Sequence, residues 1–318
     1  MENLNPTENQ NTKSILMVEP VAFGYNAETA KNNYFQEKPA ESEFFVNQEK
    51  ALAEFQAMVG KLKDAGVEVL VVKDTAEPHT PDSIFPNNWF STHANGNIAI
   101  YPMYAENRRA ERRPEIFEII ENHGFKINDV IDFTEAEEDE IYLEGTGSMI
   151  LDRENRLAYA AISPRTDENL LLEFCEEFEF TPVIFKALQN SNGENKAIYH
   201  TNVMMCVAHQ YVVICLESIL DEKERKNVTK FLKNSGKEII TITTQQMNHF
   251  AGNMLQVESQ NGEKKLVMSQ SAFNSLENSQ LEALEKYNEI IPVAIPTIEK
   301  LGGGSARCMM AEIFLPKA

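Results

Sequence analysis

The residues with the clearest chemical potential lie near the end of the chain, where a cysteine follows a run of glycines. The sequence there is Gly302-Gly303-Gly304-Ser305-Ala306-Arg307-Cys308-Met309. A thiolate is a nucleophile when nearby cations or hydrogen-bond donors favour the charged form and the sulfur is approachable. Arg307 is a candidate cation. Because a buried structural cysteine after a flexible turn is the alternative, the assignment of Cys308 as a nucleophile depends on the other segments.

A histidine, a carboxylate and several asparagines occur in polar segments that are far apart in the sequence. These segments are 81–89, 143–148, 199–203 and 247–253, and the glycine–cysteine run is the fifth. A cysteine, a histidine and an orienting acid together form the site of a cysteine-dependent hydrolase. His200 is therefore the candidate general acid–base, with His249 as its rival, and Glu144 is the candidate acid beside it.

The elements that must bring these segments together repeat along the chain. Helical periodicity predicts amphipathic helices at residues 48–65, 113–124, 168–179, 221–236 and 277–288. A β-rich stretch follows each helix, at residues 67–72, 125–130, 181–185, 238–243 and 290–295. The first four units also contain a pair of strands split by a turn. The fifth unit ends at its own strand, 308–315, so the opening strand, 15–18, is left to complete it.

Small repeated ββαβ units cannot bury their faces alone, so we expect them to pack against one another around an axis. The sequence thus predicts a closed α/β ring, with a doubly wound open sheet as the alternative. In a ring, the five polar segments converge at one end of the axis. We expect one catalytic domain over residues 14–318 and a loose tail over residues 1–13, which are polar and rich in asparagine.

Composition excludes several classes of partner. The 318 residues carry a net charge of −20, which argues against nucleic acid because phosphates demand a basic surface. No run approaches the roughly 18–20 apolar residues of a membrane span, and the polar start is unlike a signal peptide. The four cysteines are scattered, which favours a reducing cytoplasm, and Cys175, Cys206 and Cys215 are assigned to the core.

Two charged clusters complete the inventory. The arginines at 108, 109, 112 and 113 are predicted to form the solvated start of a helix or a rim that attracts an anion. The acidic run 135–140 is predicted to be a solvated loop. No histidine or cysteine spacing matches a zinc site, so no metal is expected.

The polar segments resemble those of the guanidino-modifying enzymes, or pentein superfamily, which includes arginine deiminase, dimethylarginine dimethylaminohydrolase and glycine amidinotransferase. The matching pieces occur in the family's order and are Phe85-Pro86-Asn87-Asn88, Glu144-Gly145, Ser163-Pro164-Arg165-Thr166, His200-Thr201-Asn202 and Arg307-Cys308-Met309. The branch of citrulline-utilisation hydrolases looks most similar. The resemblance implies a five-bladed α/β propeller of ββαβ repeats around a pseudo-fivefold axis, with no cofactor.

The resemblance also implies roles for individual residues. The family's catalytic cysteine and histidine map to Cys308 and His200, with Glu144 beside the histidine or on the substrate's N–H groups. The family arginine that holds a substrate carboxylate maps to Arg165. The family pattern Glu-Gly-Gly-Asp is replaced by Glu144-Gly145-Thr146-Gly147, so no second acid is available there.

The expected substrate follows from two asparagines. In arginine deiminases, the positions that match Asn88 and Asn202 are aspartates, which grip a cationic guanidinium. Here both are neutral amides, which can also donate to a ureido oxygen. Asp82 remains a carboxylate and, with Phe85, completes the expected substrate-binding set.

The expected activity is hydrolysis of citrulline to ornithine, ammonia and carbon dioxide. An arginine deiminase or dimethylarginine-type amidinohydrolase and an amidinotransferase stay open as alternatives. Some penteins are non-catalytic binding proteins, which is an alternative from another class. The expected partner is a small amino acid, without nucleic acid or membrane, and a homodimer is left open.

Overall fold

The computed structural model describes residues 8–40, 44–191 and 193–318. Within these residues, the strands form five three-stranded sheets and one two-stranded sheet. In spatial order the five sheets are β17 (Ala311–Ile313), β1 (Ser14–Glu19) and β2 (Glu68–Lys73); β3 (Phe90–Thr92), β4 (Asn97–Ile100) and β5 (Asp129–Asp132); β6 (Met149–Asp152), β7 (Leu157–Ala161) and β8 (Thr181–Phe185); β11 (Met205–Val207), β12 (Tyr211–Ile214) and β13 (Glu238–Thr241); β14 (Leu255–Glu258), β15 (Lys264–Ser269) and β16 (Glu289–Val293). The small sheet pairs β9 (Leu188–Ser191) with β10 (Glu194–Ala197).

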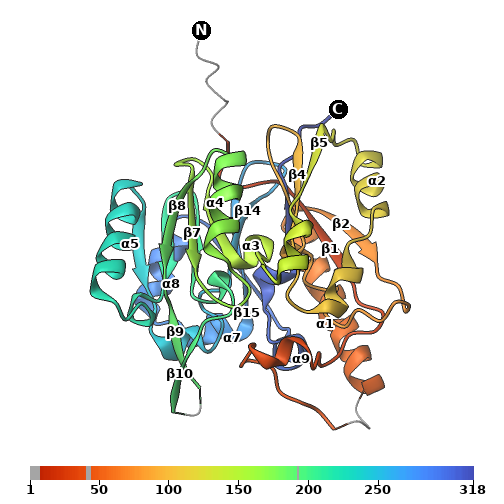
Figure 1. Cartoon of the computed structure of the whole chain (residues 1–318), viewed down its shortest axis with the longest axis horizontal. Coiled ribbons are helices and arrows are strands. Elements are labelled where there is room, and N and C mark those ends of the chain that lie inside the picture. The colour runs from red at the N-terminus through yellow and green to blue at the C-terminus, as the bar shows by residue number, and fades with distance from the viewer. Residues whose placement is uncertain (1–7, 41–43, 192) are drawn as a thin grey trace.

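All five sheets share one connectivity. The first strand is antiparallel to the second, and the second is parallel to the third. Parallel strands need a crossover, and helices supply it in every unit. These helices are α1 (Phe44–Asp64), α2 (Glu115–Asn122), α4 (Glu168–Glu177), α5 (Glu222–Asn234), and the pair α7 (Gln270–Ser275) and α8 (Asn278–Glu285). Figure 1 shows α2 and α5 at opposite outer edges of the molecule and α3 (Gly145–Ser148) near its centre. The fold is mixed α/β, as the sequence predicts.

The opening strand completes the last unit. In the structure β1 pairs antiparallel with β17, in the register Ser14 to Ile313, and parallel with β2. The predicted pairing of the two ends of the domain is therefore confirmed. One predicted strand is displaced, because β5 begins at Asp129 whereas the stretch 125–130 was expected to be extended. Phe125 instead forms an isolated bridge with Lys317.

Apolar periodicity explains why the crossover helices form and which face they bury. Along α4, the residues Leu170, Leu171 and Phe174 are buried, whereas Asp167 caps the N-terminus by accepting from the N–H groups of Asn169 and Leu170. Such a cap contributes about 1 kcal/mol. The helix thus presents one apolar stripe to its sheet.

The cysteines other than Cys308 belong to the apolar core. Burial raises the pKa of the Cys175 and Cys206 thiols to about 12 and that of Cys215 to about 11. Such thiols stay protonated and inert at neutral pH. Their predicted place in the core is confirmed.

The expected loose tail at residues 1–13 needs correction. Residues 1–7 lie outside the described part of the chain, but the side chains of Glu8 and Gln10 are buried. The amide of Gln10 donates to the carbonyls of Leu151 in β6 and Val207 in β11, at 3.0 and 3.1 Å. This segment packs because its amides and acids match backbone groups that would otherwise lack partners. Among the described helices, none has the length and apolarity that a membrane crossing requires.

Candidate active site

Short helical turns precede the first strand of the sheets and carry the polar segments. The turns η3 (Pro86–Asn88), α3, η6 (Thr201–Val203) and η8 (Ala306–Met309) lead into β3, β6, β11 and β17, respectively. Because the first strands occupy equivalent positions in their sheets, the turns gather on one side. Residues from three of these turns and their flanks, those of η3, η6 and η8, line one cavity.

This cavity is small and enclosed. Its walls are formed by Thr29, Asn33, Asp82, Phe85, Asn88, Arg108, Arg165, Tyr199, His200, Gly302, Gly304 and Cys308. Its volume of about 10 Å³ for the centre of a water molecule has room for about one water. Cys308, His200 and every residue predicted to bind substrate except Asn202 are therefore brought together here. Glu144 and Asn202 lie immediately behind the wall, bonded to His200 and Cys308.

Two amide groups point at the proposed nucleophile. The Sγ of Cys308 accepts hydrogen bonds from Asn202 Nδ2 and Asn253 Nδ2, both at 3.3 Å. Asn253 is fixed in turn, because its Oδ1 accepts from the N–H of Arg307 at 3.1 Å. Donors of this kind stabilise negative charge on sulfur. The candidate cation Arg307 points elsewhere, to the carbonyl of Met310 and the carboxylate of Glu312.

His200 and Glu144 form a buried pair. Nε2 of His200 lies 2.7 Å from Oε2 of Glu144, whose other oxygen accepts from the N–H of Tyr104. Burial lowers the pKa of His200 to about 4, although Glu144 opposes that shift. Burial alone would raise the pKa of Glu144, but Arg165 and the bond with His200 hold it well below the ordinary value. The stable form at neutral pH is thus a neutral imidazole that donates to a carboxylate.

Glycine at position 147 keeps the second imidazole nitrogen accessible. A Cβ built there would lie 2.8 Å from Nδ1 of His200 and 2.5 Å from Nδ2 of Asn88. Both separations are shorter than real Cβ contacts, so any larger residue would displace the histidine or the asparagine. Since Nε2 is engaged with Glu144, Nδ1 is the nitrogen that remains free to accept a proton.

Arg165 lines the cavity with its donors already in use. Its Nε donates to Oδ1 of Asn32 at 2.8 Å, and its Nη2 donates to the carbonyl of Thr29 at 2.9 Å. Its Nη1 lies 3.4 Å from Glu144. The predicted carboxylate-binding arginine is therefore at the site, but a substrate carboxylate must compete with Asn32 for its fork.

A second buried arginine was not predicted to be at the site. Arg108 lies in the turn η4 (Glu106–Glu111), is 2% exposed, and forms a two-pronged pair with Glu111 at 2.9 Å. Its Nη1 donates to Oδ1 of Asn88 at 2.8 Å. The expectation of a solvated basic cluster is thus wrong for Arg108, because its partner three residues on neutralises it. The acidic run is also not wholly solvated, since Glu137 accepts from the N–H of Met103 and pairs with Arg109 and Arg112.

Several buried polar atoms facing this region have no partner among the described residues. They are Oδ1 of Asp82, Oδ1 of Asn202 and Nδ2 of Asn32. The other oxygen of Asp82 accepts from Asn26 and Thr29, and burial raises the pKa of this carboxyl. Unpaired buried polar atoms are costly. Two unused acceptors and one unused donor therefore indicate a polar ligand.

Residues 26–37 cover the cavity. The amide of Asn33 donates to the carbonyls of Gly302 and Gly303, and that of Gln36 donates to Gly302. The ring of Phe85 packs on the same loop, where a Cβ at position 302 would lie 2.7 Å from it. Figure 1 shows this early segment beside α9 (Pro296–Gly302).

Sequence reasoning missed Asn253 and the residues of the covering segment. Asn253 lies in the fourth polar segment, which the repeat singled out, but attention there went to His249. His249 is exposed and lies 3.4 Å from Ser271, in a groove without the cysteine. The position of the segment was the signal; the residue type was not. Among the described residues, no group of His, Cys, Asp or Glu could hold a metal ion.

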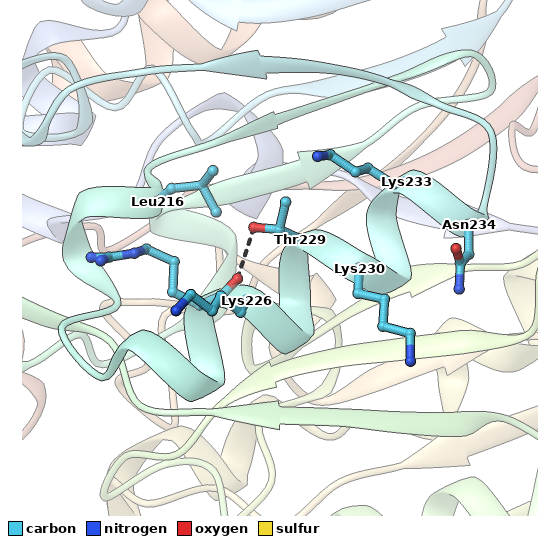
Figure 2. Close-up of a pocket in the computed structure, with 7 residues that line it drawn as sticks. Leu216, Lys226, Thr229, Lys230, Lys233 and Asn234 are labelled. Atoms are coloured by element: carbon cyan, nitrogen blue, oxygen red, sulfur yellow. Dashed lines mark hydrogen bonds between the residues drawn. The ribbon is translucent and has the colours of Figure 1, made fainter.

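A wider groove of about 430 Å³ runs along α5 and is lined by Leu216, Arg225, Lys226, Thr229, Lys230, Lys233 and Asn234. Figure 2 shows that its charged side chains are basic and come mostly from α5. These lining residues include no cysteine, histidine or carboxylate. We therefore assign the active site to the smaller cavity.

Comparison with known proteins agrees with this assignment of the fold. The profile of a family described as N,N dimethylarginine dimethylhydrolase, eukaryotic, matches residues 19–315. No curated protein matches the chain. The structure resembles that of ArgZ, an arginine dihydrolase from the ornithine–ammonia cycle in cyanobacteria, with a TM-score of 0.73 at 18% identity. That match covers 96% of this chain and 41% of ArgZ, so the chain spans about two fifths of the relative's length.

Two further structures match along nearly their whole length. The N-terminal domain of ArgZ bound to substrate gives a TM-score of 0.71 at 18% identity, covering 95% of this chain and 99% of that domain. DDAH from Pseudomonas aeruginosa, complexed with citrulline, gives a TM-score of 0.63 at 16% identity, covering 95% and 99%. At such identities these structures share the fold.

Proposed function

The chain belongs to the N,N-dimethylarginine dimethylhydrolase family of pentein guanidino-modifying hydrolases, and we propose that it cleaves the ureido group of an amino acid through a covalent intermediate on Cys308. The enzyme is a hydrolase of non-peptide C–N bonds. The best candidate substrate is citrulline, and the products would be ornithine, ammonia and carbon dioxide. An arginine-type or dimethylarginine-type guanidino substrate is the second candidate, because relatives of the same fold are an arginine dihydrolase and DDAH.

One observation carries the proposal. Cys308 and His200 come from stretches more than 100 residues apart, yet both line one enclosed cavity, and Glu144 bonds the histidine from behind. A nucleophile, a base and an orienting acid in one pocket make up a covalent hydrolytic site.

The reaction would proceed in two halves. The thiolate of Cys308 attacks the planar ureido carbon, and the amides of Asn202 and Asn253 stabilise the sulfur charge beforehand. His200 takes a proton on Nδ1 and passes it to the departing nitrogen, which leaves as an amine or ammonia. The remaining carbonyl is then bonded to sulfur. His200 activates a water that cleaves this bond, and the resulting carbamate breaks down to an amine and carbon dioxide.

Charge in the cavity favours a ureido group over a guanidinium. The carboxylate of Glu111 is neutralised by Arg108, and that of Glu144 by Arg165. Only Asp82 is left to meet a cation, and an amino acid already brings an α-ammonium for it. A guanidinium is a second cation and would face two buried arginines, whereas the ureido group is neutral. Oδ1 of Asn202, which lacks a partner, would accept a substrate N–H beside the sulfur.

The proposal extends to the architecture. The five sheets would close into a five-bladed propeller around a pseudo-fivefold axis, as one domain over residues 14–318 of a cytoplasmic enzyme. In support, β17 pairs with β1, and the first strands contact one another, β17 with β3 and β11 with β6 and β14. Since the cavity has room for about one water, residues 26–37 must move to admit an amino acid.

A substrate panel tests the proposal. Citrulline, arginine, an N-acylated arginine and dimethylarginine are each incubated with the enzyme, and ornithine, citrulline, ammonia and amines are quantified. We expect the highest kcat/KM with citrulline. Arginine turned over faster than citrulline would refute the ureido preference. Adding glycine or lysine and finding an amidino or carbamoyl product would identify a transferase instead.

A further inference from the structure

A buried carboxyl that the mechanism does not use lies beneath the glycine–cysteine loop. Glu299 belongs to α9 and is 8% exposed. Its Oε1 accepts from the hydroxyl of Ser305 at 2.6 Å. The hydroxyl of Ser269, at the end of β15, also faces this carboxyl. Glu299 therefore joins the helix before the loop to the residue at which the loop ends.

Ser305 passes this restraint to the nucleophile. It is fully buried and directly precedes η8, the turn that contains Cys308. Its carbonyl accepts the backbone N–H of Cys308 at 3.0 Å. A short chain of bonds thus runs from the Glu299 carboxyl through Ser305 to the backbone of the cysteine.

The loop between the two residues needs such a restraint. Residues 302–304 are all glycine, so the loop has no side chains of its own to pack and has more backbone freedom than any other tripeptide. Its cavity side is held by Phe85, Asn33 and Gln36, which belong to other elements, and the latter two belong to the segment that must move. The Glu299–Ser305 bond remains when that segment opens.

The carboxyl of Glu299 is not needed for the helix itself. The first N–H groups of α9 are satisfied by Glu54 of α1, which accepts from Thr297 and Ile298 at 3.0 and 3.1 Å. The end of α9 is closed by the backbone, where Gly303 N–H donates to the carbonyl of Glu299 at 2.9 Å. Removing the side chain therefore leaves the helix bonds in place.

We propose that Glu299 is a positioning residue that, through Ser305, holds the sulfur of Cys308 in line with His200. This inference rests on the proposed nucleophilic role of Cys308. Burial raises the pKa of the Glu299 carboxyl to about 7, so much of it is uncharged at neutral pH and adds little negative charge near the thiolate. A hydrogen-bond acceptor, not a charge, is what the position requires.

The test compares Glu299→Ala, Glu299→Gln and Ser305→Ala with a control of similar cost to stability. Asp221→Ala removes the N-cap of α5, where Asp221 accepts from Lys223 and Glu224, far along the chain from the cysteine loop. For each variant we would measure kcat and KM with the best substrate, the rate at which chloroacetamidine alkylates Cys308, and Tm.

We expect Glu299→Ala and Ser305→Ala to lower both kcat and the alkylation rate by about tenfold or more, with KM within about threefold. Glu299→Gln keeps an acceptor for the Ser305 hydroxyl and should retain both rates within about threefold. Asp221→Ala should lower Tm and leave both rates unchanged.

Either of two outcomes would overturn the inference: unchanged rates in Ser305→Ala, or a loss in Glu299→Gln as large as that in Glu299→Ala. Failure of the proposed function looks different. In that case the wild-type enzyme would not be alkylated at Cys308, or Cys308→Ser would still turn over substrate, before any loop variant is considered.

Discussion

At the scale of single residues, His200 determines how the site responds to acid. Its pKa in the folded protein is about 4, below the 6.5 of an unfolded chain, because the ring is buried. Between these two values the unfolded chain takes up a proton that the folded protein does not, so the free energy of unfolding decreases as pH falls from 6.5 to 4.

Replacing His200 by Gln should remove this contribution. We predict that the decrease in unfolding free energy between pH 6.5 and 4 becomes smaller by on the order of 3 kcal/mol, from the shift of about 2.5 pKa units. Urea denaturation of both proteins at several pH values measures it. Parallel pH profiles for the two proteins would mean that the imidazole is not held neutral.

Asn202 provides the residue-scale test of substrate choice. Its Nδ2 donates to the sulfur at 3.3 Å, and its Oδ1 has no partner. An aspartate there would lose the donor and bring a charge that suits a guanidinium. We predict that Asn202→Asp raises the ratio of kcat/KM for arginine to that for citrulline by about tenfold, roughly 1.4 kcal/mol. The exposed Asn248→Asp is the control, and an equal change in both variants would sink the argument.

The sequence was informative about residues where type and position in the repeat agreed. Cys308, His200 and Glu144 each stand in a polar segment and were expected to meet, and they do lie around one cavity, while their catalytic roles stay predictions. Arg108 could not be found this way. It lies outside those segments, and only the folded chain shows that Glu111 neutralises it and Asn88 accepts its hydrogen bond.

At the scale of elements, the site depends on how closely three short turns approach. Gly147 in α3 faces Asn88 of η3 and His200 beside η6. We predict that Gly147→Ala lowers kcat by about a hundredfold, because a displaced histidine no longer meets the substrate. Overpacking should also lower the unfolding free energy by about 1–3 kcal/mol.

The matched control is Gly60→Ala in α1, where an added Cβ would meet nothing within 4 Å. There, alanine should stabilise the protein by about 0.5–1 kcal/mol and leave kcat unchanged. Steady-state kinetics and urea denaturation of both variants give the comparison. Wild-type kcat in Gly147→Ala would mean that the contact of α3 with His200 does not matter.

Elements were predictable wherever one face is apolar and one is polar. The five crossover helices begin and end within a few residues of their expected bounds, since periodicity and caps such as Asp167 and Asp221 are local signals. The strand β5 was displaced because its start is set by a distant partner: Phe125 bridges to Lys317 near the other end of the chain. No local pattern contains that information.

At the scale of the whole molecule, the segment near the start of the chain joins separate sheets. Gln10 bonds to β6 and β11, and its Oε1 accepts from the N–H of Arg153 at 2.8 Å. The sequence suggested a loose tail because polar residues carry no burial signal of their own. Their burial depends on backbone groups that only the assembled sheets present.

This assembly gives a further prediction. Replacing Gln10 by Ala leaves buried carbonyls and an N–H unpaired, so the unfolding free energy should fall by about 1–3 kcal/mol. The exposed Gln210→Ala should change it by less than about 0.5 kcal/mol. Urea denaturation of the two variants decides it, and equal stabilities would show that the segment is not integral to the fold.

The central claim is that Cys308 forms a covalent bond with the substrate carbon, and one measurement tests it most directly. The reaction with citrulline is quenched with acid at early times, and the peptides are mapped by mass spectrometry. We predict a carbamoyl-type adduct on the peptide that contains Cys308, which appears before product and accumulates when hydrolysis is slowed. Full turnover with no adduct on that peptide at any time, or with turnover retained in Cys308→Ser, would contradict the account.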